Sequence, residues 1–261
     1  MKAVDLFAGC GGMSAGFSQA GFSLRAAYEY WEPAAAIYRV NFPDHPVFPL
    51  DLSDVDEARE HVAQWNADLI IGGPPCQDFS SAGKRDESLG RANLTVAFAE
   101  IIRHAEPRWF VMENVQRARS SNAYAEARKV FRDSGYGLTE AVLDASLCGA
   151  PQKRKRLFVV GERGGENGAV ESILARNQAA TRMTPRDYFG DALGIDHYYR
   201  HPRSYQRRAI FSIDEPSPTV RGVNRPVPPN YAAHPGDRAA PKDVRPLTTR
   251  ERAMIQTFPE A

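Results

Sequence analysis

The fold can be worked out from residues 68–77, which read DLIIGGPPCQ. The short apolar run is typical of a buried strand, and the glycines and prolines after it predict a turn. Because proline restricts its own backbone and that of the residue before it, the turn holds Cys76 in a defined position. An inert buried cysteine is the commoner reading of a lone Pro-Cys pair, so the rest of the chain decides.

Apolar strand-like segments alternate with segments of helical periodicity along the first 160 or so residues. We expect strands at 2–7, 23–29, 47–50, 68–71, 108–112, 137–144 and 156–160, and helices at 12–20, 33–41, 54–64, 93–105 and 123–133. Strands that alternate with helices indicate an α/β fold with a mostly parallel sheet covered on both faces. The last two strands are expected to form a hairpin.

The regular pattern stops at Gly161. Residues 164–246 are rich in Pro, Gly, Arg and Tyr and show no sustained periodicity, which predicts a second, small, irregular region. A helix is expected again over residues 248–256, with Thr248 or Thr249 as its N-cap.

Composition limits the class of protein. The chain has 261 residues, 43% of them hydrophobic and 25% charged, which suits one large α/β domain with a small addition. It holds no apolar run long enough for a transmembrane helix, and no signal-peptide core follows Met1. The three cysteines lack Cys-x-x-Cys spacing, so we expect no disulfide, no metal site and a reducing, cytoplasmic location.

Charge is distributed unevenly along the chain. Residues 1–151 carry more Asp and Glu than Lys and Arg, whereas residues 152–261 carry more Lys and Arg. The basic part is expected to meet a polyanion. A solvated basic face is the alternative.

A glycine-rich turn, DLFAGCGG at residues 5–12, joins the first strand to the first helix. Glycines there let a ligand approach the backbone, and Glu29 at the end of the second strand can accept both hydroxyls of a ribose. The dinucleotide fingerprint is incomplete, because Ser14 stands where its third glycine would be. Asp5 would repel a pyrophosphate but suits the cationic groups of S-adenosylmethionine, so we favour that cofactor over NAD. A turn used only for packing is the alternative.

In chain order, these segments resemble those of the DNA (cytosine-5) methyltransferase family of bacterial restriction–modification systems. The residues that carry the resemblance are 5–12, Glu29, Asp51, 75–80 (PCQDFS), 93–94 (NL), 113–115 (ENV), 152–156 (QKRKR) and 245–251 (RPLTTRE). The resemblance covers nearly the whole chain outside residues 164–244. It implies a Rossmann-like S-adenosylmethionine-dependent methyltransferase sheet with helices on both faces, plus a small irregular target-recognition region.

The resemblance also implies a division of the chain. We expect a catalytic and cofactor-binding domain at residues 1–163, a target-recognition region at 164–244 and a helix at 245–261 that returns to the catalytic domain. The family continues beyond this helix with a segment that packs on the first strand. We expect its absence to reflect a truncated chain, a second polypeptide that supplies it, or a degenerate homologue.

Cofactor residues follow from the resemblance alone. Phe7, Gly9 and Gly11 would line the methionine end, and Glu29 would take the ribose hydroxyls. The adenine would be surrounded by Tyr30, Asp51, Leu52 and Leu94.

Cytosine carbon 5 is a poor nucleophile until another group adds to carbon 6 of the ring. Cys76 is the proposed nucleophile, because a thiolate adds readily to such a carbon. Glu113, expected on the loop after residues 108–112, would protonate ring nitrogen N3, for which burial would have to raise its pKa. A surface carboxylate is the alternative for Glu113. Arg154 and Arg156 alternate, so on a strand they would share one face and hold the cytosine O2 and a phosphate or the Cys76 loop; a solvated basic edge strand is the alternative.

Binding to duplex DNA is expected, because the target carbon is reached only when the base is flipped out of the helix. The polar loop at residues 77–91 would close over the base, with Ser80, Lys84 and Arg85 as DNA contacts. Residues 197–208 mix aromatics with arginines, as DNA-contacting segments do. By the resemblance Thr219 would contact the DNA backbone, whereas Arg221, Asn224 and Arg225 are candidate base readers, with phosphate contact or solvation as their alternatives.

The resemblance therefore implies an enzyme that methylates carbon 5 of a flipped-out cytosine in a specific duplex DNA sequence, through a covalent Cys76 adduct, in the cytoplasm at the nucleoid. Two alternatives stay open: methylation of tRNA, and a catalytically impaired DNA-binding homologue that needs a second subunit. The Cys-Phe-Thr signature of the tRNA branch does not occur in the chain, and Cys76 and Glu113 are both present.

Overall fold

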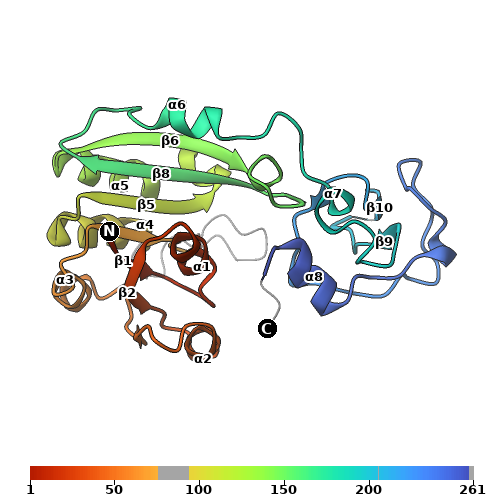
Figure 1. Ribbon diagram of the computed structural model, residues 1–261, viewed down its shortest axis with the longest axis horizontal. Helices are drawn as coiled ribbons and strands as arrows, with labels where there is room; N and C mark the ends of the chain where they lie inside the picture. Colours follow the sequence, from red (N-terminus) through yellow and green to blue (C-terminus); the bar gives the residue numbers. More distant parts are fainter. Residues whose placement is uncertain (76–93, 205, 259–261) are drawn as a thin grey trace. The chain divides into compact units, whose positions relative to one another are not determined.

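A computed structural model describes residues 1–75, 94–204 and 206–258. The chain divides into two compact units (Figure 1). Unit 1 comprises Met1–Val142 and Arg156–Ala175, and unit 2 comprises Leu143–Lys155 and Arg176–Ala261. In the described ranges, no helix combines the length and the apolar character that crossing a lipid bilayer requires.

Unit 1 is built on a seven-stranded sheet in the order β3-β2-β1-β4-β5-β8-β6. The first five strands in the chain are β1 (Lys2–Leu6), β2 (Ser23–Tyr28), β3 (Val47–Phe48), β4 (Leu69–Gly72) and β5 (Trp109–Val115), and they pair in parallel. β8 (Lys155–Arg163) pairs antiparallel with β5, and β6 (Tyr136–Asp144) lies beside β8 at the edge. The mostly parallel α/β sheet predicted from the sequence is confirmed.

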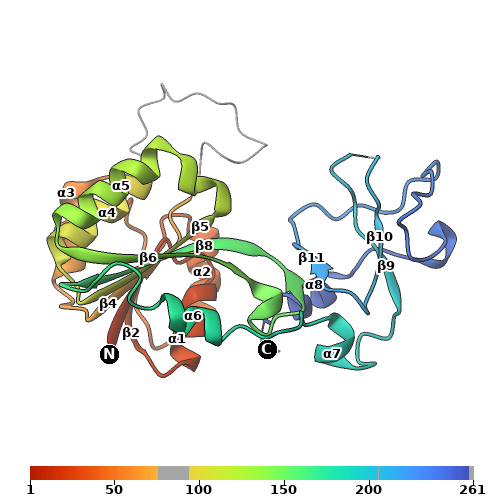
Figure 2. The same ribbon diagram turned by 90° about the horizontal axis from the view of Figure 1, so that it is seen from above.

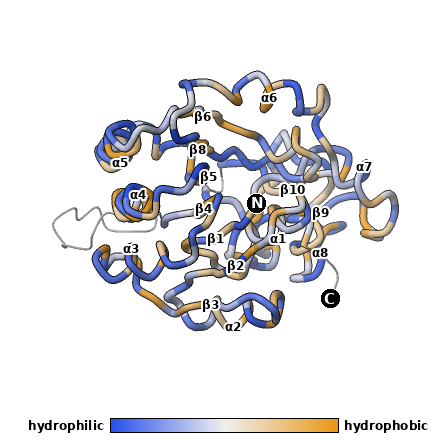
Figure 3. The backbone as a smooth tube through the Cα atoms, turned by 60° about the vertical axis from the view of Figure 1, so that its left-hand side comes forward, coloured by the Kyte–Doolittle hydropathy of each residue, from blue (hydrophilic) through white to orange (hydrophobic). Residues whose placement is uncertain are grey.

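Helices cover both faces of this sheet (Figure 2). Their bounds are α1 (Gly12–Gln19), α2 (Glu32–Asn41), α3 (Val55–Ala63), α4 (Leu94–Ala105), α5 (Asn122–Asp133) and α6 (Glu171–Arg176). The largest buried cluster joins α3, α4 and α5 to one face, and smaller clusters join α1 and α2 to the other. Hydrophobic and hydrophilic segments alternate along α5 in Figure 3, as expected for a helix that buries one side.

Close packing around Phe110 fixes α5 and β8 on β5. The Phe110 ring stacks on Phe131 of α5, with 4.2 Å between ring centroids. On the neighbouring strand, Gly161 pairs with Phe110, and a Cβ at Gly161 would lie 2.0 Å from the Phe110 ring. Only glycine lets the two strands pair with this ring between them.

Strand β5 is longer than the sequence predicted. It continues through Val115 because each residue from Trp109 to Val115 pairs with a residue of β8. Glu113 therefore lies inside a strand opposite Phe158, and its predicted place on a loop after residue 112 is wrong.

Unit 2 consists of short elements, in agreement with the irregular region expected from the sequence. Its strands β9 (His197–Tyr199) and β10 (Ile210–Ser212) form an antiparallel pair, and β7 (Gln152–Lys153) pairs in parallel with β11 (Ser217–Pro218). Its helices are α7 (Pro185–Phe189) and α8 (Thr249–Ile255). Single 3-10 turns lie at Gln116–Ser120 in unit 1 and at Ala145–Leu147 and Pro241–Asp243 in unit 2.

Helix α8 packs within unit 2. Leu247 and Ile255 belong to the same buried cluster as Tyr198 and Phe211. Contacts thus group residues 245–258 with unit 2, whereas the sequence interpretation had them return to the catalytic domain. The functional limits drawn at residues 163 and 244 stay predictions.

Candidate active site

The turn after β1 has the backbone conformation that a ligand-binding turn needs. Phe7, Gly9 and Gly11 all have positive φ, at 57°, 56° and 95°. A Cβ at Gly11 would lie 2.2 Å from the Phe42 ring, so that position accepts only glycine. Beside Gly9 no atom lies within 4 Å of a Cβ position. The turn is therefore packed at Gly11 and open at Gly9.

Glu29 joins this turn to the end of β2. Its Oε2 accepts a hydrogen bond from the Gly9 N–H at 2.8 Å, and its Oε1 accepts one from the Trp31 N–H at 2.8 Å. The structure thus brings together Gly9 and Glu29, two of the residues predicted to hold the cofactor. A carboxylate with two charge-assisted bonds to backbone N–H groups is held in a fixed orientation.

The other predicted cofactor residues differ in exposure. The Tyr30 and Trp31 side chains next to Glu29 are 66% and 67% exposed, so two large aromatic rings lie uncovered here. Asp51 is exposed, and its Oδ1 accepts from the Ser53 N–H at 2.9 Å. The remaining two are Leu52, buried in the main core, and Leu94, half-buried at the start of α4.

Asp5 has a different role from the one the sequence suggested. Its side chain is 1% exposed, and its Oδ2 accepts from the Ser14 N–H at 3.1 Å and the Ser14 hydroxyl at 2.7 Å. Burial raises the pKa of Asp5 to about 7, against the opposing effect of these hydrogen bonds. The carboxyl group ties the turn to α1, so the argument that it favours a cationic cofactor by facing it is not supported.

A Glu–Arg pair lies between β5 and β8, at the end of the sheet that also carries the turn after β1. The Arg156 Nε donates to the Glu113 Oε1 at 2.8 Å, and both side chains are mostly buried. The other carboxylate oxygen faces β4, since a Cβ at Gly73 would lie 3.5 Å from the Glu113 Oε2. Glu113 and Arg156, both predicted as catalytic residues, are thus brought into contact.

A hydrogen bond joins the turn after β4 to β5, next to Glu113. The buried Asn114 donates through Nδ2 to the Pro74 carbonyl at 3.2 Å. Pro75, next in the chain, is exposed and directly precedes Cys76. The sequence interpretation used Asn114 only as part of a motif. Alternate residues of a strand face the same side, so Asn114 could have been predicted to face inward with Met112, two residues earlier.

Several predicted residues lie outside the described residues. They are Cys76, Ser80, Lys84 and Arg85, together with the loop at 77–91. Arg154 is described, but the strand breaks at it, between β7 and β8, because β7 pairs with β11 and β8 pairs with β5. The expectation that Arg154 and Arg156 share one face of a strand is therefore wrong; Arg154 groups with unit 2 and Arg156 with unit 1.

In unit 2 the predicted DNA-contacting residues make internal hydrogen bonds. The Thr219 hydroxyl donates to the Lys153 carbonyl at 2.8 Å, and the Asn224 Nδ2 donates to the Leu247 carbonyl at 2.8 Å. Arg221 donates to the His201 carbonyl, whereas Arg225 is exposed. These bonds order the segment that carries the predicted readers.

Sequence reasoning did not single out Arg200, which lies beside Arg221. Its Nη2 donates to the Thr219 carbonyl at 2.7 Å. Burial, with the nearby charge of Arg221 next in effect, lowers the pKa of Arg200 to about 10. The buried Nε atoms of Arg200 and Arg221 have no hydrogen-bond partner in the described part of the chain. Two partly buried guanidinium groups side by side are an unfavourable arrangement that an anion would relieve.

Comparison with known proteins gives consistent matches. A family model described as C-5 cytosine-specific DNA methylase matches residues 1–261. The chain is 56% identical over 259 residues to the Type II methyltransferase M.HgiDI of Herpetosiphon aurantiacus, covering 99% of this chain and 84% of that protein. It is 53% identical over 263 residues to the Type II methyltransferase M.HindV of Haemophilus influenzae, covering 100% of this chain and 86% of that one.

A solved structure supports the fold. The Dnmt2 methyltransferase of S. pombe matches with a TM-score of 0.60 and 22% identity, covering 72% of this chain and 59% of that one.

Proposed function

Because the chain belongs to the C-5 cytosine-specific DNA methylase family, we propose that it methylates carbon 5 of a flipped-out cytosine in a specific duplex DNA sequence. The observation that carries this proposal is the pairing of Glu113 with Arg156 at 2.8 Å, beside the turn that leads into Cys76. It supports a site where a thiol, a carboxylate and a guanidinium meet one pyrimidine ring.

S-adenosylmethionine use agrees with family membership, and the residues present fit this cofactor. The open space beside Gly9 leaves room for a ligand against the backbone, and Glu29 is held at its edge. We propose that Glu29 accepts the ribose hydroxyls, that Tyr30 packs on the adenine, and that Phe7, Gly11, Asp51, Leu52 and Leu94 complete the pocket. When bound, the cofactor supplies a methyl group on a positively charged sulfur.

Cys76 would act as the nucleophile. Its thiolate forms a bond to carbon 6 of the cytosine, and the electron pair of the carbon 5–carbon 6 bond becomes available at carbon 5. After methylation, loss of the carbon 5 proton to water restores the double bond and breaks the carbon–sulfur bond. The hydrogen bond from Asn114 to Pro74 would fix the position of the backbone that leads into Cys76.

Glu113 would act on ring nitrogen N3. Because Glu113 forms an ion pair with Arg156, we propose that N3 takes the proton that the Cys76 thiol gives up as its sulfur adds, and that Glu113 accepts a hydrogen bond from this N3–H. N3 returns the proton to the sulfur when the carbon–sulfur bond breaks. This differs from the expectation of an acid kept protonated by burial. Arg156 would hold Glu113 in place, and Arg154 stays a predicted contact to substrate.

DNA contact would come from unit 2. Arg200 and Arg221 offer partly buried guanidinium groups that lack an acidic partner in the described residues. Arg225, four residues after Arg221, is exposed. We propose that Thr219, Arg221, Asn224 and Arg225 contact DNA together with Arg200. The predicted contacts Ser80, Lys84 and Arg85 and a second polypeptide stay predictions.

A mechanism-based trap tests the proposal. Duplex DNA with 5-fluorocytosine at the target cannot lose its carbon 5 substituent as a proton, so the Cys76 adduct should persist and migrate as a covalent complex on a denaturing gel. Cys76→Ala should form none. An adduct that persists in Cys76→Ala would contradict the proposal.

Substrate class is tested separately. Labelled methyl groups should appear in duplex DNA and not in tRNA. Transfer to tRNA alone would favour the tRNA alternative, and binding of DNA without transfer would favour the impaired homologue.

A further inference from the structure

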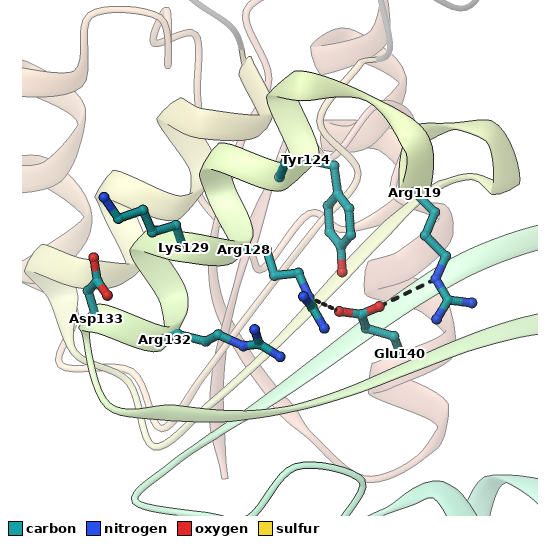
Figure 4. Close-up of a pocket in the computed structure, with 8 residues that line it drawn as sticks. Arg119, Tyr124, Arg128, Lys129, Arg132, Asp133 and Glu140 are labelled. Atoms are coloured by element: carbon teal, nitrogen blue, oxygen red, sulfur yellow. Dashed lines mark hydrogen bonds and ion pairs between the residues drawn. The ribbon is translucent and has the colours of Figure 1, made fainter.

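A cavity of about 430 Å³ lies between α5 and β6 in unit 1, apart from the residues assigned above (Figure 4). It is lined by the carboxylates of Asp133 and Glu140 and by four cations: Arg119, Arg128, Lys129 and Arg132. All four come from α5 and the turn before it, and Glu140 of β6 closes the opposite side.

Positive charge exceeds negative charge in this cavity. Glu140 is shared, since the Arg119 Nε lies 3.4 Å from its Oε2 and the Arg128 Nε lies 2.5 Å from its Oε1 (Figure 4). In the parts of the chain that the structure describes, neither Lys129 nor Arg132 forms an ion pair. The lining therefore holds four cations against two carboxylates, and Lys129 and Arg132 are available to a ligand.

A buried hydroxyl points into the same cavity. Tyr124 is 2% exposed, and Figure 4 shows its ring directed toward Glu140. Its hydroxyl lies close enough to Glu140 to interact with it, yet it forms no hydrogen bond of normal geometry with the described residues. Burial, with the charge of Glu140 next in effect, raises the pKa of Tyr124, so the hydroxyl keeps its proton as a donor. A buried polar group without a partner is destabilising, and a hydrogen bond to a ligand oxygen would remove that penalty.

From the cavity, its surplus cations and this unpartnered donor, we propose that the α5–β6 cavity binds a phosphate group. Guanidinium forks match the oxygens of phosphate, and Lys129 adds a point charge. The cavity's volume falls in the range of small-ligand sites, roughly 300–1,000 Å³, so it holds more than an isolated phosphate.

The phosphate has two possible sources. It is either a backbone phosphate of DNA flanking the target, which rests on the proposed function, or a free polyphosphate or nucleotide, which does not. Arg119 lies in the 3-10 turn that follows β5, six residues after Glu113. The cations of the cavity therefore begin close in sequence to Glu113.

The test compares two double variants. Lys129→Ala/Arg132→Ala removes the two cations that lack ion pairs. The control, Lys2→Ala/Arg25→Ala, removes one exposed lysine and one exposed arginine elsewhere in unit 1. Tripolyphosphate binding is followed by calorimetry, and binding to 14- and 40-base-pair duplexes with the same central site is followed by anisotropy over a salt series.

A free-phosphate site predicts that tripolyphosphate binds and that Lys129→Ala/Arg132→Ala weakens it at least tenfold while the control does not. A backbone site predicts that only the 40-base-pair duplex loses affinity, with its salt slope reduced by about 1–2. If neither ligand distinguishes the two double variants, the proposal is overturned. Adduct trapping on the short duplex reports on Cys76 independently of either result.

Tyr124→Phe keeps the packing and removes the donor. It should lower phosphate affinity about threefold to tenfold, the effect of one hydrogen bond of about 1 kcal/mol, and leave the unliganded protein at least as stable. Unchanged affinity in Tyr124→Phe would show that the hydroxyl does not reach the ligand.

Discussion

At the scale of single residues, the buried chain Asp5–Ser14–Tyr38 shows how a polar group supports the glycine-rich turn. Ser14 donates to Asp5 through both its N–H and its hydroxyl, and its oxygen lies 2.8 Å from the Tyr38 hydroxyl. This network links β1, α1 and α2 behind the open space at Gly9. The turn's shape therefore depends on residues that a bound cofactor would not touch.

Asp5→Asn should remove a pH dependence of stability. The pKa of Asp5 is about 7 in the folded protein, above its ordinary value of 3.8. Between about pH 4 and pH 7 the folded protein thus binds more protons at Asp5 than the unfolded protein does. The stability that this proton contributes is present at low pH and is lost as pH rises through 7. As pH rises, the unfolding free energy of the natural protein should fall, relative to that of Asp5→Asn, by up to about 1.4 kcal/mol per pH unit.

Urea unfolding from pH 5 to pH 8 measures this difference. Asp44→Asn, at an exposed aspartate, is the matched control and should follow the natural protein. Parallel pH profiles for Asp5→Asn and the natural protein would rule out a buried, titrating Asp5.

Glu113→Gln should lower the rate of methyl transfer by about 10²–10³, the usual loss when one group that stabilises developing charge is removed. Affinity for S-adenosylhomocysteine should change little, because Glu29 and the Gly9 turn belong to other strands. Glu106→Gln is the control, since Glu106 also forms an ion pair, with the Arg163 Nη2 at 2.8 Å, but in an exposed position away from the site. Equal effects of the two substitutions would argue for a structural role for Glu113.

At the scale of elements, α8 shows how a local signal fixes a helix start. The Thr248 hydroxyl accepts from the Glu251 N–H at 3.2 Å, and the Glu251 carboxylate accepts from the Thr248 N–H at 2.7 Å. This capping box resolves the choice between Thr248 and Thr249 left open by the sequence. Arg252 of the same helix donates to the Arg221 carbonyl, so the helix also supports the segment that carries Arg221.

Thr248→Ala should destabilise unit 2 by about 1 kcal/mol, the usual value of an N-cap. Thr249→Ala, one residue later, should have little effect because Thr249 is the first residue of the helix and the cap is made by Thr248. Urea unfolding followed by circular dichroism compares the two. A larger loss in Thr249→Ala would mean that the helix starts elsewhere.

At the scale of the whole molecule, the uneven charge of the sequence becomes a specific local arrangement in unit 2. Arg200 and Arg221 lie together, and burial together with their mutual repulsion lowers the pKa of Arg200. The pKa of His201 is also lowered, by burial and by the charges of Arg225 and Arg221. The free protein thus carries unfavourable positive charge where a polyanion is proposed to bind.

Arg200→Met should weaken duplex DNA binding and reduce its salt slope by about 1, the effect of one lost phosphate contact. The unfolding free energy should change little, because the lost hydrogen bond to Thr219 is offset by removing a poorly solvated charge. Arg25→Met, at an exposed arginine of unit 1, is the control. Anisotropy titrations at several salt concentrations give the result, and unchanged affinity in Arg200→Met would exclude Arg200 from the DNA contact.

Much of unit 1 could be predicted from local signals. Apolar runs such as residues 68–71 and 2–7 marked strands that the structure places side by side, and helix periodicity located all five predicted helices to within a few residues. Glu29 and Gly9 could be predicted to meet because both follow parallel strands, whose carboxyl ends lie at one edge. The continuation of β5 through residues 113–115 was missed. It depends on pairing with the antiparallel strand β8, and nothing in the sequence near these residues indicates that pairing.

The amino-acid sequence by itself determined the α/β class, the order of its elements, the glycine-rich turn and the family. These follow from periodicity, backbone preference and motif order, which act between residues close in the chain. Only the tertiary structure decided that Glu113 meets Arg156, that Asp5 is buried against Ser14, and that α5 and β6 enclose a basic cavity. Each of these contacts joins segments whose meeting depends on strand order, a property that no local stretch of sequence encodes.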